Sequence, residues 1–529
     1  MSQSPTQQRK LGAQISHMLK SRGVDVIFGI PGVHNQEMYR GIEEAGIAHV
    51  LARHEQGAGF MADGYARATG KPGVAYIITG PGLCNILTPL GQAYSDSVPV
   101  LAISSCLDET SATRGQLHQM LDQRAAGATV CAWSEEARDA ASAYALIDRA
   151  LTEFEAGRPR PRHLQVPIRM LESYADPAPA RPEPVLRETR PEAGAEMVAK
   201  ALGAAQRPLF VFGGGAVAGA EDWAAIVERS GAATFTTYAG RGIASGHPFD
   251  FGAYLARPES ASVIATADLV VAVGTELAEV DLWRADLGHA CPMIRVDIDP
   301  EMLAQTPAAQ AIEADAAALA RALAPRVTTA ATGWSAEEVS AARARWYAES
   351  VGERAGIAPV CEALRAALPE DVMIYSDMTQ FAYQAKEIWP MSRPGHWHHP
   401  FGFGTLGYAL PAAIGGAVAR KGQPTLCIAG DYGFQYTVQE LGTAVELGLP
   451  LPILLWDNQK LKEIEDSMVR AQIAPNSVIA HNPDFVALGK AYGAHAVRPS
   501  SPEEVAAAVL EAFTADRPTL IHVNSDIAR

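Results

Sequence analysis

The sequence contains little cysteine and more acidic than basic residues. Its 529 residues include six cysteines, none in a Cys-x-x-Cys pair. This usage excludes a disulfide framework and a zinc site, and it indicates reduced thiols in a protein that we expect in the cytoplasm. Lysine and arginine total 43 against 59 aspartates and glutamates, which gives a formal net charge of -16. No nucleic-acid partner is expected, because phosphate backbones bind clustered positive charge.

Long apolar runs are also absent. The longest weakly polar stretch, residues 406–419, contains Pro411 and several glycines, and it is shorter than the ~20 residues of a membrane span. The first ten residues (MSQSPTQQRK) are polar and lack the apolar segment of a signal peptide. We therefore expect no membrane partner.

Short apolar runs recur along the chain, separated by alanine-rich amphipathic stretches. They include residues 24–28, 73–78, 98–103, 208–212, 269–273, 293–297, 372–375, 425–429 and 451–456. Continuous apolar strands between helices are typical of parallel sheets that are covered on both faces. The pattern predicts an α/β fold built from doubly wound domains with parallel sheets.

Two changes in composition divide the chain. Residues 173–195 are rich in proline and charge, which is typical of a linker. The strand pattern is lost again after residue 324, and we place a second linker at residues 326–350. The expected domains are therefore residues 1–172, 196–325 and 351–529, each large enough for one hydrophobic core.

Asp431 stands where a ligand site is expected. It follows an apolar run and precedes a predicted helix, so it lies at the carboxyl end of a strand, where parallel sheets bind ligands. The next apolar run leads to Asn458, which we expect beside Asp431. A carboxylate, an amide oxygen and a backbone carbonyl suit Mg²⁺ bound to a diphosphate. The alternative is two unrelated turns, because Gly-Asp and Asp-Asn are common turn dipeptides.

Glu55 begins a second informative segment. It opens a predicted helix after an apolar run, and small residues follow it at positions 57, 58, 59, 62, 64 and 66. Small side chains allow another part of the structure to approach the helix backbone closely. The alternative is an ordinary close helix contact, with Glu55 on the surface near the positive end of its helix.

Further motifs occur in a fixed order along the chain. They are residues 28–32 (FGIPG), 79–85 (TGPGLCN), 94–99 (YSDSVP), 162–167 (RHLQVP), 213–215 (GGG), 296–300 (VDIDP) and 402–407 (GFGTLG). Together with Glu55 and Asp431, this order resembles the thiamine-diphosphate-dependent 2-oxo acid decarboxylase and acetolactate synthase superfamily over essentially the whole chain. The resemblance implies a pyrimidine-binding domain (1–172), a central Rossmann-like domain (196–325) and a diphosphate-binding domain (351–529).

The resemblance also implies cofactors and the residues that hold them. The implied cofactors are thiamine diphosphate and Mg²⁺. FAD is not expected, because residues 276–279 read ELAE where acetolactate synthases carry an FAD-associated Arg-Phe-Asp-Asp-Arg stretch. Glu55 would bind the pyrimidine N1′, so that the cofactor's own 4′-nitrogen removes the C2 proton. Leu406 would support the bent shape of the cofactor.

The resemblance assigns the remaining site residues by position. Asp431, Asn458 and the backbone carbonyl of Lys460 would hold Mg²⁺, and His118 would face the substrate, with His34 as a weaker candidate. The other expected cofactor contacts are Pro31, Gly32, Gly80, Asn85, Thr379, Gln380, Gly404, Gly430, Tyr432 and Gly433.

Several stretches are most similar to 5-guanidino-2-oxopentanoate (2-ketoarginine) decarboxylases, namely residues 30–34, 115–124, 274–279 and 378–380. The implied reaction is non-oxidative decarboxylation of a 2-oxo acid to an aldehyde and CO₂. Glu463 or Glu465 would bind a guanidinium, or both lie on a solvated helix face. The alternatives are an acetolactate synthase-like carboligase and a catalytically silent cofactor-binding subunit.

Three residues depart from the family's pattern. Tyr432 replaces a glycine after Asp431, and Asp457 replaces an asparagine before Asn458. Gln119 stands where the ketoarginine decarboxylases carry glutamate, which weakens the assignment of a cationic substrate. The resemblance further implies a homodimer or homotetramer whose active sites lie at subunit interfaces, with Glu55 and Asp431 supplied by different chains.

Overall fold

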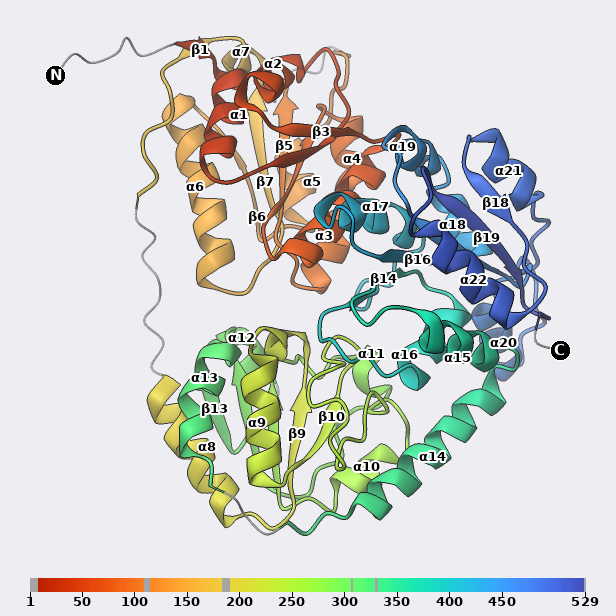
Figure 1. The fold of residues 1–529 in the computed structure, drawn as a ribbon. Coiled ribbons are helices and arrows are strands. Elements are labelled where there is room, and N and C mark those ends of the chain that lie inside the picture. The colour runs from red at the N-terminus through yellow and green to blue at the C-terminus, as the bar shows by residue number, and fades with distance from the viewer. Residues whose placement is uncertain (1–7, 109–114, 183–190, 306–307, 329–331, 528–529) are drawn as a thin grey trace.

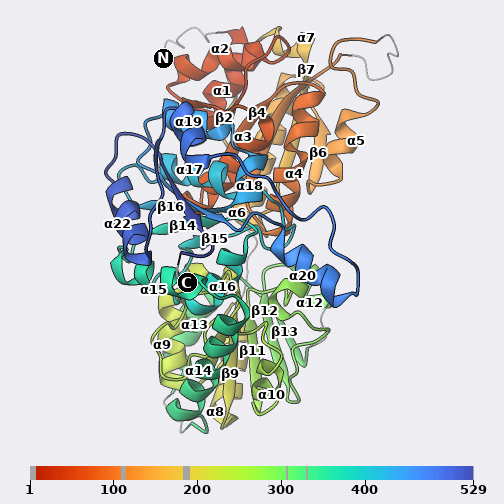
Figure 2. The same ribbon diagram turned by 90° about the vertical axis from the view of Figure 1, so that its right-hand side faces the viewer.

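Three parallel α/β sheets of six, five and six strands make up most of the molecule (Figures 1 and 2). The computed structural model describes residues 8–108, 115–182, 191–305, 308–328 and 332–527. The expected fold class is confirmed. Among the helices of these described ranges, none combines the length and apolar character of a membrane span.

The N-terminal domain carries a parallel sheet in the order β3-β2-β4-β5-β7-β6. Its strands are β2 (Val26–Gly29), β3 (Ala48–Leu51), β4 (Gly73–Ile77), β5 (Val100–Cys106), β6 (Trp133–Glu136) and β7 (Arg162–Pro167). Its helices are α1 (Leu11–Ser21), α2 (Gln36–Ala45), α3 (Glu55–Thr69), α4 (Pro81–Ser95), α5 (Gln123–Ala128), α6 (Ala140–Ala156) and α7 (Ile168–Leu171). A small antiparallel pair joins β1 (Arg9–Lys10) to β8 (Tyr174–Ala175). Every residue of β4 and β5 is buried, as expected for central parallel strands covered on both faces.

The central domain lies at the bottom of Figure 1, and its sheet has the order β10-β9-β11-β12-β13. The strands are β9 (Pro208–Phe212), β10 (Ala233–Thr236), β11 (Leu269–Val273), β12 (Met293–Asp297) and β13 (Gln310–Glu313). The helices are α8 (Pro191–Ala204), α9 (Ala220–Ser230), α10 (Ser260–Ile264), α11 (Glu279–Leu282), α12 (Pro300–Gln305) and α13 (Ala316–Leu323), with 3₁₀ turns η1 (Gly214–Gly219) and η2 (Ala324–Arg326). Helix α8 begins inside the first expected linker, at a proline, which suits the first turn of a helix.

The C-terminal domain has the strand order β15-β14-β16-β17-β19-β18. Its strands are β14 (Met373–Ser376), β15 (Trp397–His398), β16 (Thr425–Gly430), β17 (Pro452–Asp457), β18 (His495–Val497) and β19 (Thr519–Asn524). Its helices are α15 (Ile357–Ala367), α16 (Gln380–Ile388), α17 (Ala409–Ala419), α18 (Asp431–Tyr436), α19 (Glu440–Glu446), α20 (Lys462–Arg470), α21 (Phe485–Ala491) and α22 (Pro502–Ala512). The second expected linker is largely the long helix α14 (Ala336–Glu353), which runs along the edge of the molecule in Figure 1. The expected domain limits remain a prediction.

Helices α3 and α17 join the N-terminal and C-terminal domains through their backbones. A Cβ atom on Gly64 would lie 2.0 Å from the carbonyl oxygen of Ala412, and one on Gly415 would lie 2.0 Å from that of Met61. The small residues after Glu55 therefore serve a close helix contact, which was the alternative explanation for them. Glu55 itself is buried, with 8% of its surface exposed, so it is not the surface residue of that alternative.

Candidate active site

Glu55 is held at the start of α3 by a neighbouring helix. The helix begins here because the Nδ1 atom of His54 accepts a hydrogen bond from the backbone N–H of Gln56. Asn85 of α4 donates its Nδ2–H to Glu55 Oε2 at 2.9 Å. Gly80 precedes α4 with a φ of +71°, a conformation that favours glycine. The structure therefore brings Asn85 to the buried carboxylate of Glu55, and Gly80 shapes the start of the helix that carries Asn85.

The loop after β2 lies against the residues that precede α4. Gly32 donates its N–H to Asn35 Oδ1 at 2.7 Å, and a Cβ atom on Gly32 would lie 2.2 Å from Ile78 Cδ1. Neighbouring Pro31 is exposed. Gly32 thus has to be small for this loop to approach the α4 segment.

His118 contacts a second histidine, His34. The two rings meet edge to face with centroids 4.8 Å apart, and both Nδ1 atoms are buried without a hydrogen-bond partner among the described residues. Burial lowers the pKa of His34, and the nearby His118 lowers it further. His118 has a φ of +64°. A Cβ atom on Gly80 would lie only 2.3 Å from the carbonyl oxygen of His118. Sparsely populated backbone conformations of this kind cluster at functional sites.

Asp431 lies at the carboxyl edge of the C-terminal sheet. It is the first residue of α18, and the strand before it pairs with β17 so that Gly430 stands opposite Trp456. This register places Asp457, the last residue of β17, beside Asp431. Burial raises the pKa of Asp431 to about 6, with a further contribution from the charge of Asp457.

Asn482 connects these two carboxyl groups. Its Nδ2 atom lies 2.7 Å from Asp431 Oδ2 and 2.8 Å from Asp457 Oδ1. On its other side, Asp457 Oδ2 lies 2.8 Å from Nε2 of His522. Burial acts to raise the pKa of Asp457, but the hydrogen bonds from His522 and Asn482 outweigh burial and hold that pKa below its usual value.

Asn458 and Lys460 lie in the turn directly after β17, the strand that pairs with β16. Asn458 Oδ1 accepts a hydrogen bond from the backbone N–H of Lys460 at 3.2 Å, and the turn between them contains Gln459 with a φ of +58°. The structure thus places the three expected metal ligands at the ends of two paired strands. Among the described residues, no group of three or more histidine, cysteine, aspartate or glutamate side chains has the arrangement of a metal site. The expected Mg²⁺ ligands are not such a group, because they are one carboxylate, one side-chain amide and one backbone carbonyl.

Asp377 organises the glycine-rich segments around Asp431. Its carboxylate accepts the N–H of Gly407 at 2.9 Å, and a Cβ atom on Gly433 would lie 2.6 Å from its Oδ2. Leu406 is half-buried in the turn before α17, and Gly404 and Gly407 on either side of it have φ values of +65° and +84°. Positive φ values at these glycines give the turn a shape that residues with a side chain rarely adopt.

The first turn of α16 lies beside the end of β16. A Cβ atom on Gly430 would lie 3.0 Å from Thr379 Oγ1, and Gln380 is the first residue of α16. Tyr432 lies within α18, so its backbone is helical and tolerates a side chain. Replacement of the usual glycine by Tyr432 therefore leaves the local backbone intact, because the close approach falls on Gly433 instead.

Three family models match the chain in order. The N-terminal thiamine pyrophosphate (TPP) binding domain matches residues 9–126, the central domain of TPP enzymes matches residues 195–323, and the C-terminal TPP binding domain matches residues 377–523. The chain belongs to the thiamine pyrophosphate enzyme family. The expected family is confirmed, and thiamine diphosphate is the cofactor of this enzyme.

Curated relatives cover the chain almost completely. A probable 2-ketoarginine decarboxylase of Pseudomonas aeruginosa is 42% identical over 98% of this chain and 94% of its own length. The large subunit of acetolactate synthase isozyme 2 of Escherichia coli is 30% identical over 97% of this chain and 95% of its own length. The acetolactate synthase large subunit of Haemophilus influenzae is 28% identical, with 94% and 91% covered.

The residues at the two sheet edges fit the two ends of thiamine diphosphate. Around Glu55 a buried carboxylate faces an amide, which suits a ring with nitrogen donors and acceptors. Around Asp431 two buried carboxyl groups share a single amide donor, which suits a divalent cation. No described hydrogen bond or ion pair joins the Glu55 cluster to the Asp431 cluster within this chain.

The two glutamates considered for guanidinium binding already have cationic partners. Glu463 lies 3.4 Å from Arg354, and Glu465 lies 3.2 Å from Lys460 and 3.4 Å from Lys462. Since both carboxylates are paired within the chain, their geometry favours neither as a free receptor for a substrate guanidinium.

Sequence reasoning missed Asn482 and Asp377. Asn482 stands in a segment without regular structure between α20 and α21, and no spacing relates it to Asp431. Asp377 follows the apolar run 372–375, so its place at the carboxyl end of a strand was a usable signal. Asn482 donates a hydrogen bond to the expected ligand Asp431, and Asp377 accepts one from Gly407, the neighbour of Leu406.

Proposed function

We propose that this enzyme is a Mg²⁺-dependent decarboxylase that converts a 2-oxo acid, 5-guanidino-2-oxopentanoate, to the aldehyde and CO₂. The observation that carries the proposal is the buried Glu55 carboxylate with Asn85 bound to its Oε2 atom. The choice of substrate is supported by the 42% identity to the probable 2-ketoarginine decarboxylase.

When bound, thiamine diphosphate supplies a thiazolium that accepts the electrons left by departing CO₂. Glu55 would hold a proton at the pyrimidine N1′, and Asn85 would keep its carboxylate in place. Leu406 would support the bend of the cofactor. Apolar surroundings favour loss of CO₂, because they do not solvate the carboxylate group of the substrate.

His118, paired with His34, would deliver the proton that completes the aldehyde. Burial lowers the pKa of His34, and the charge of His118 lowers it further, which favours the neutral form of His34. A histidine is suited to this role because its pKa lies near neutral pH.

The metal would be held by Asp431, Asn458 and the backbone carbonyl of Lys460. Support comes from the pairing of β16 with β17, which brings Asp431 and the turn with Asn458 and Lys460 to the same edge of the sheet. The proposed enzyme does not use FAD. Arg158 of the N-terminal domain forms ion pairs with Glu276 and with Asp299, at the edge of the central sheet where a dinucleotide would bind.

We infer that the active unit is a homodimer or a pair of dimers, with each site built from two chains. Helix α20 has no buried side chain in the single chain. Its apolar residues Ile464 and Val469 are 49% and 58% exposed. In the N-terminal domain, Leu117 is 62% and Leu121 97% exposed. A second copy of the chain would cover these exposed apolar side chains.

The cytoplasm remains the proposed location. All six cysteines are unpaired in the structure, and free thiols persist in reducing compartments.

The alternative function is a carboligase, which is supported by the 30% identity to the acetolactate synthase subunit. Incubation with one 2-oxo acid at a time distinguishes the two functions. The purified protein, loaded with thiamine diphosphate and Mg²⁺, is incubated with 5-guanidino-2-oxopentanoate or pyruvate, and CO₂, aldehyde and acyloin are measured. We expect CO₂ and aldehyde in equal amounts from the guanidino acid. Efficient formation of acetolactate from pyruvate, with no turnover of the guanidino acid, would refute the proposal.

A further inference from the structure

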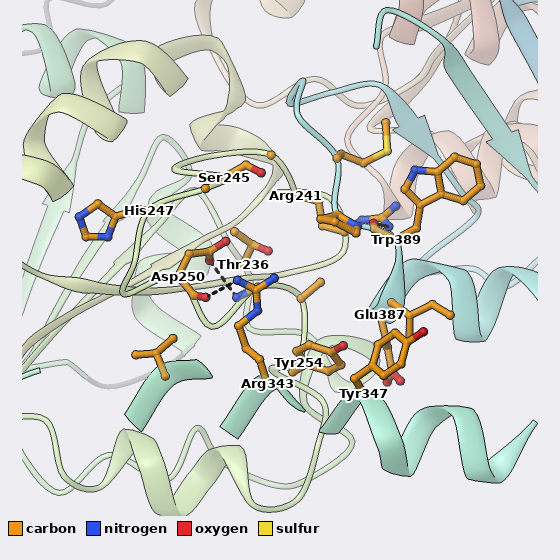
Figure 3. Close-up of a pocket in the computed structure, with 18 of the residues that line it drawn as sticks. Thr236, Arg241, Ser245, His247, Asp250, Tyr254, Arg343, Tyr347, Glu387 and Trp389 are labelled. Atoms are coloured by element: carbon orange, nitrogen blue, oxygen red, sulfur yellow. Dashed lines mark hydrogen bonds between the residues drawn. The ribbon is translucent and has the colours of Figure 1, made fainter. Parts of the chain in front are cut away.

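A cavity of about 490 Å³ lies between the central domain and the C-terminal end of α16 (Figure 3). Its walls come from residues 236–254 of the central domain, from one face of α14, from Arg365 of α15 and from residues 387–391. Neither the Glu55 cluster nor the Asp431 cluster lines it. The glycine loop at residues 213–215 does not line it either, so the cavity is separate from the dinucleotide edge of the central sheet. Its volume is that of a small-molecule site.

Three arginines line this cavity, and none of them forms an ion pair with a carboxylate of the described residues. The charge of Arg343 acts on nearby Asp250, where it opposes the rise that burial causes in the pKa of that carboxyl. Arg343 rises from α14 toward Asp250 in Figure 3, and its Nη1 donates to the backbone carbonyl of Asp250 at 3.2 Å. Arg365 of α15 is exposed and forms no hydrogen bond or ion pair with the described residues. A guanidinium has five N–H donors, so most donors of both side chains remain available.

Arg241 is the buried member of this set. It is 5% exposed, and it donates only to backbone carbonyls, those of Tyr238, Lys386 and Trp389. Its Nη2 atom is buried without a partner among the described residues. Burial lowers the pKa of Arg241 to about 9. A buried cation without a counter-ion is costly, and an anion in the cavity would offset that cost.

The two acids that line the cavity are already engaged. Asp250 accepts hydrogen bonds from Thr234 Oγ1 at 2.9 Å and from the backbone N–H of Gly252 at 2.8 Å. Glu387 forms an ion pair with Arg257, which lies outside the lining, and accepts a hydrogen bond from Ser350 at 2.8 Å. His247 adds no charge at neutral pH, because burial lowers its pKa. The lining is therefore cationic in a chain whose net charge is -16.

We propose that this cavity binds a small anion that carries two or more carboxylate or phosphate groups. Arginine forks bind both groups through paired hydrogen bonds. The side chains of Tyr254 and Tyr347 face the same space (Figure 3) and would cover the body of the ligand. The site would be a non-catalytic one, since it opens at the end of α16 opposite to Gln380.

Calorimetry with two probe anions tests the proposal. Inorganic phosphate and tricarballylate are titrated into the full-length protein, both with and without saturating thiamine diphosphate and Mg²⁺. We expect at least one probe to bind in both states. Binding by phosphate alone indicates a phosphate ligand, and binding by tricarballylate alone indicates a polycarboxylate; either supports the proposal.

Matched variants locate the bound anion. Arg343→Gln should weaken binding about tenfold or more, whereas Arg345→Gln, on the same helix but exposed and outside the lining, should leave it unchanged. If Arg343→Gln fails to fold, Arg365→Gln provides the second test, because Arg365 lines the cavity and its side chain is exposed. This variant should also weaken binding of the anion. The proposal is wrong if neither probe binds, if both arginines of α14 matter equally, or if loading the cofactor abolishes binding.

Discussion

Asp431 and Asp457 face each other across one amide group. Asn482 donates to both carboxylates, at 2.7 and 2.8 Å, and so reduces the repulsion of two acids that burial brings together. Asp431 is an expected Mg²⁺ ligand, and Asp457 replaces the asparagine that the family commonly has. The additional negative charge at position 457 is thus balanced by Asn482 and His522.

Asn482→Ala tests whether this amide stabilises the pair. The substitution leaves two buried carboxyl groups without their common donor, so the free energy of unfolding should fall by about 1–3 kcal/mol without cofactor. Bound Mg²⁺ and thiamine diphosphate should reduce that loss, because a cation then neutralises the acids. Urea unfolding with and without both cofactors measures the difference. Asn476→Ala, in the same segment but bonded only to a backbone carbonyl, is the control, and an equal loss for both variants contradicts the account.

Glu55→Gln should abolish turnover while the enzyme still binds its cofactor. Glutamine keeps the shape of the side chain but cannot hold a proton in the same way, and proton transfer by a positioned group contributes about 10²–10⁴-fold to rate. Turnover is measured on 2-oxo acids, and cofactor uptake is measured by calorimetry. Near-normal turnover would overturn the role of this carboxylate.

Gly433→Ala should destabilise the C-terminal domain. The new Cβ would lie 2.6 Å from Asp377 Oδ2, and such overpacking costs about 1–3 kcal/mol. Gly203→Ala is the matched control, because nothing lies within 4 Å of a Cβ there. Thermal unfolding should show a lower midpoint for the first variant and an unchanged or raised midpoint for the second. Equal midpoints would show that Asp377 can move away at little cost.

Stability should fall below pH 6.5 because of His163. This side chain lies buried between Ser104 and Ser134, and burial lowers its pKa from 6.5 to about 4. Between these values the unfolded chain binds a proton that the folded protein does not, so stability decreases by ~1.4 kcal/mol per pH unit.

His163→Gln removes this titration. From pH 7.5 to 5.0, the wild type should lose about 2 kcal/mol more than the variant in urea unfolding. Parallel pH dependence in the two proteins would show that His163 is protonated as easily in the folded state as in the unfolded chain.

The sheets and the strand-end positions could be predicted from the sequence, because buried parallel strands are continuous apolar runs. Asp431 and Glu55 were predicted for the same reason, since each follows such a run. The α3–α17 contact was weighed only as the alternative for the small residues after Glu55. Their spacing shows that something approaches closely, but does not show which segment approaches.

Contacts from segments without periodicity could not be predicted. Asn482 lies in an irregular segment, and the ion pair of Glu463 depends on Arg354, a distant residue that only the fold brings near. The cavity around Arg343 was also missed, because α14 falls in a stretch that was interpreted as a linker.

Mixing two inactive variants tests whether each active site is built from two chains. Glu55→Gln and Asp431→Ala should each lack turnover, the second because it loses metal-dependent cofactor binding. If each site takes Glu55 from one chain and Asp431 from another, co-expression in equal amounts should restore about a quarter of wild-type activity, because half of the dimers then contain one intact site. No recovery in confirmed mixed dimers would contradict a site built from two chains.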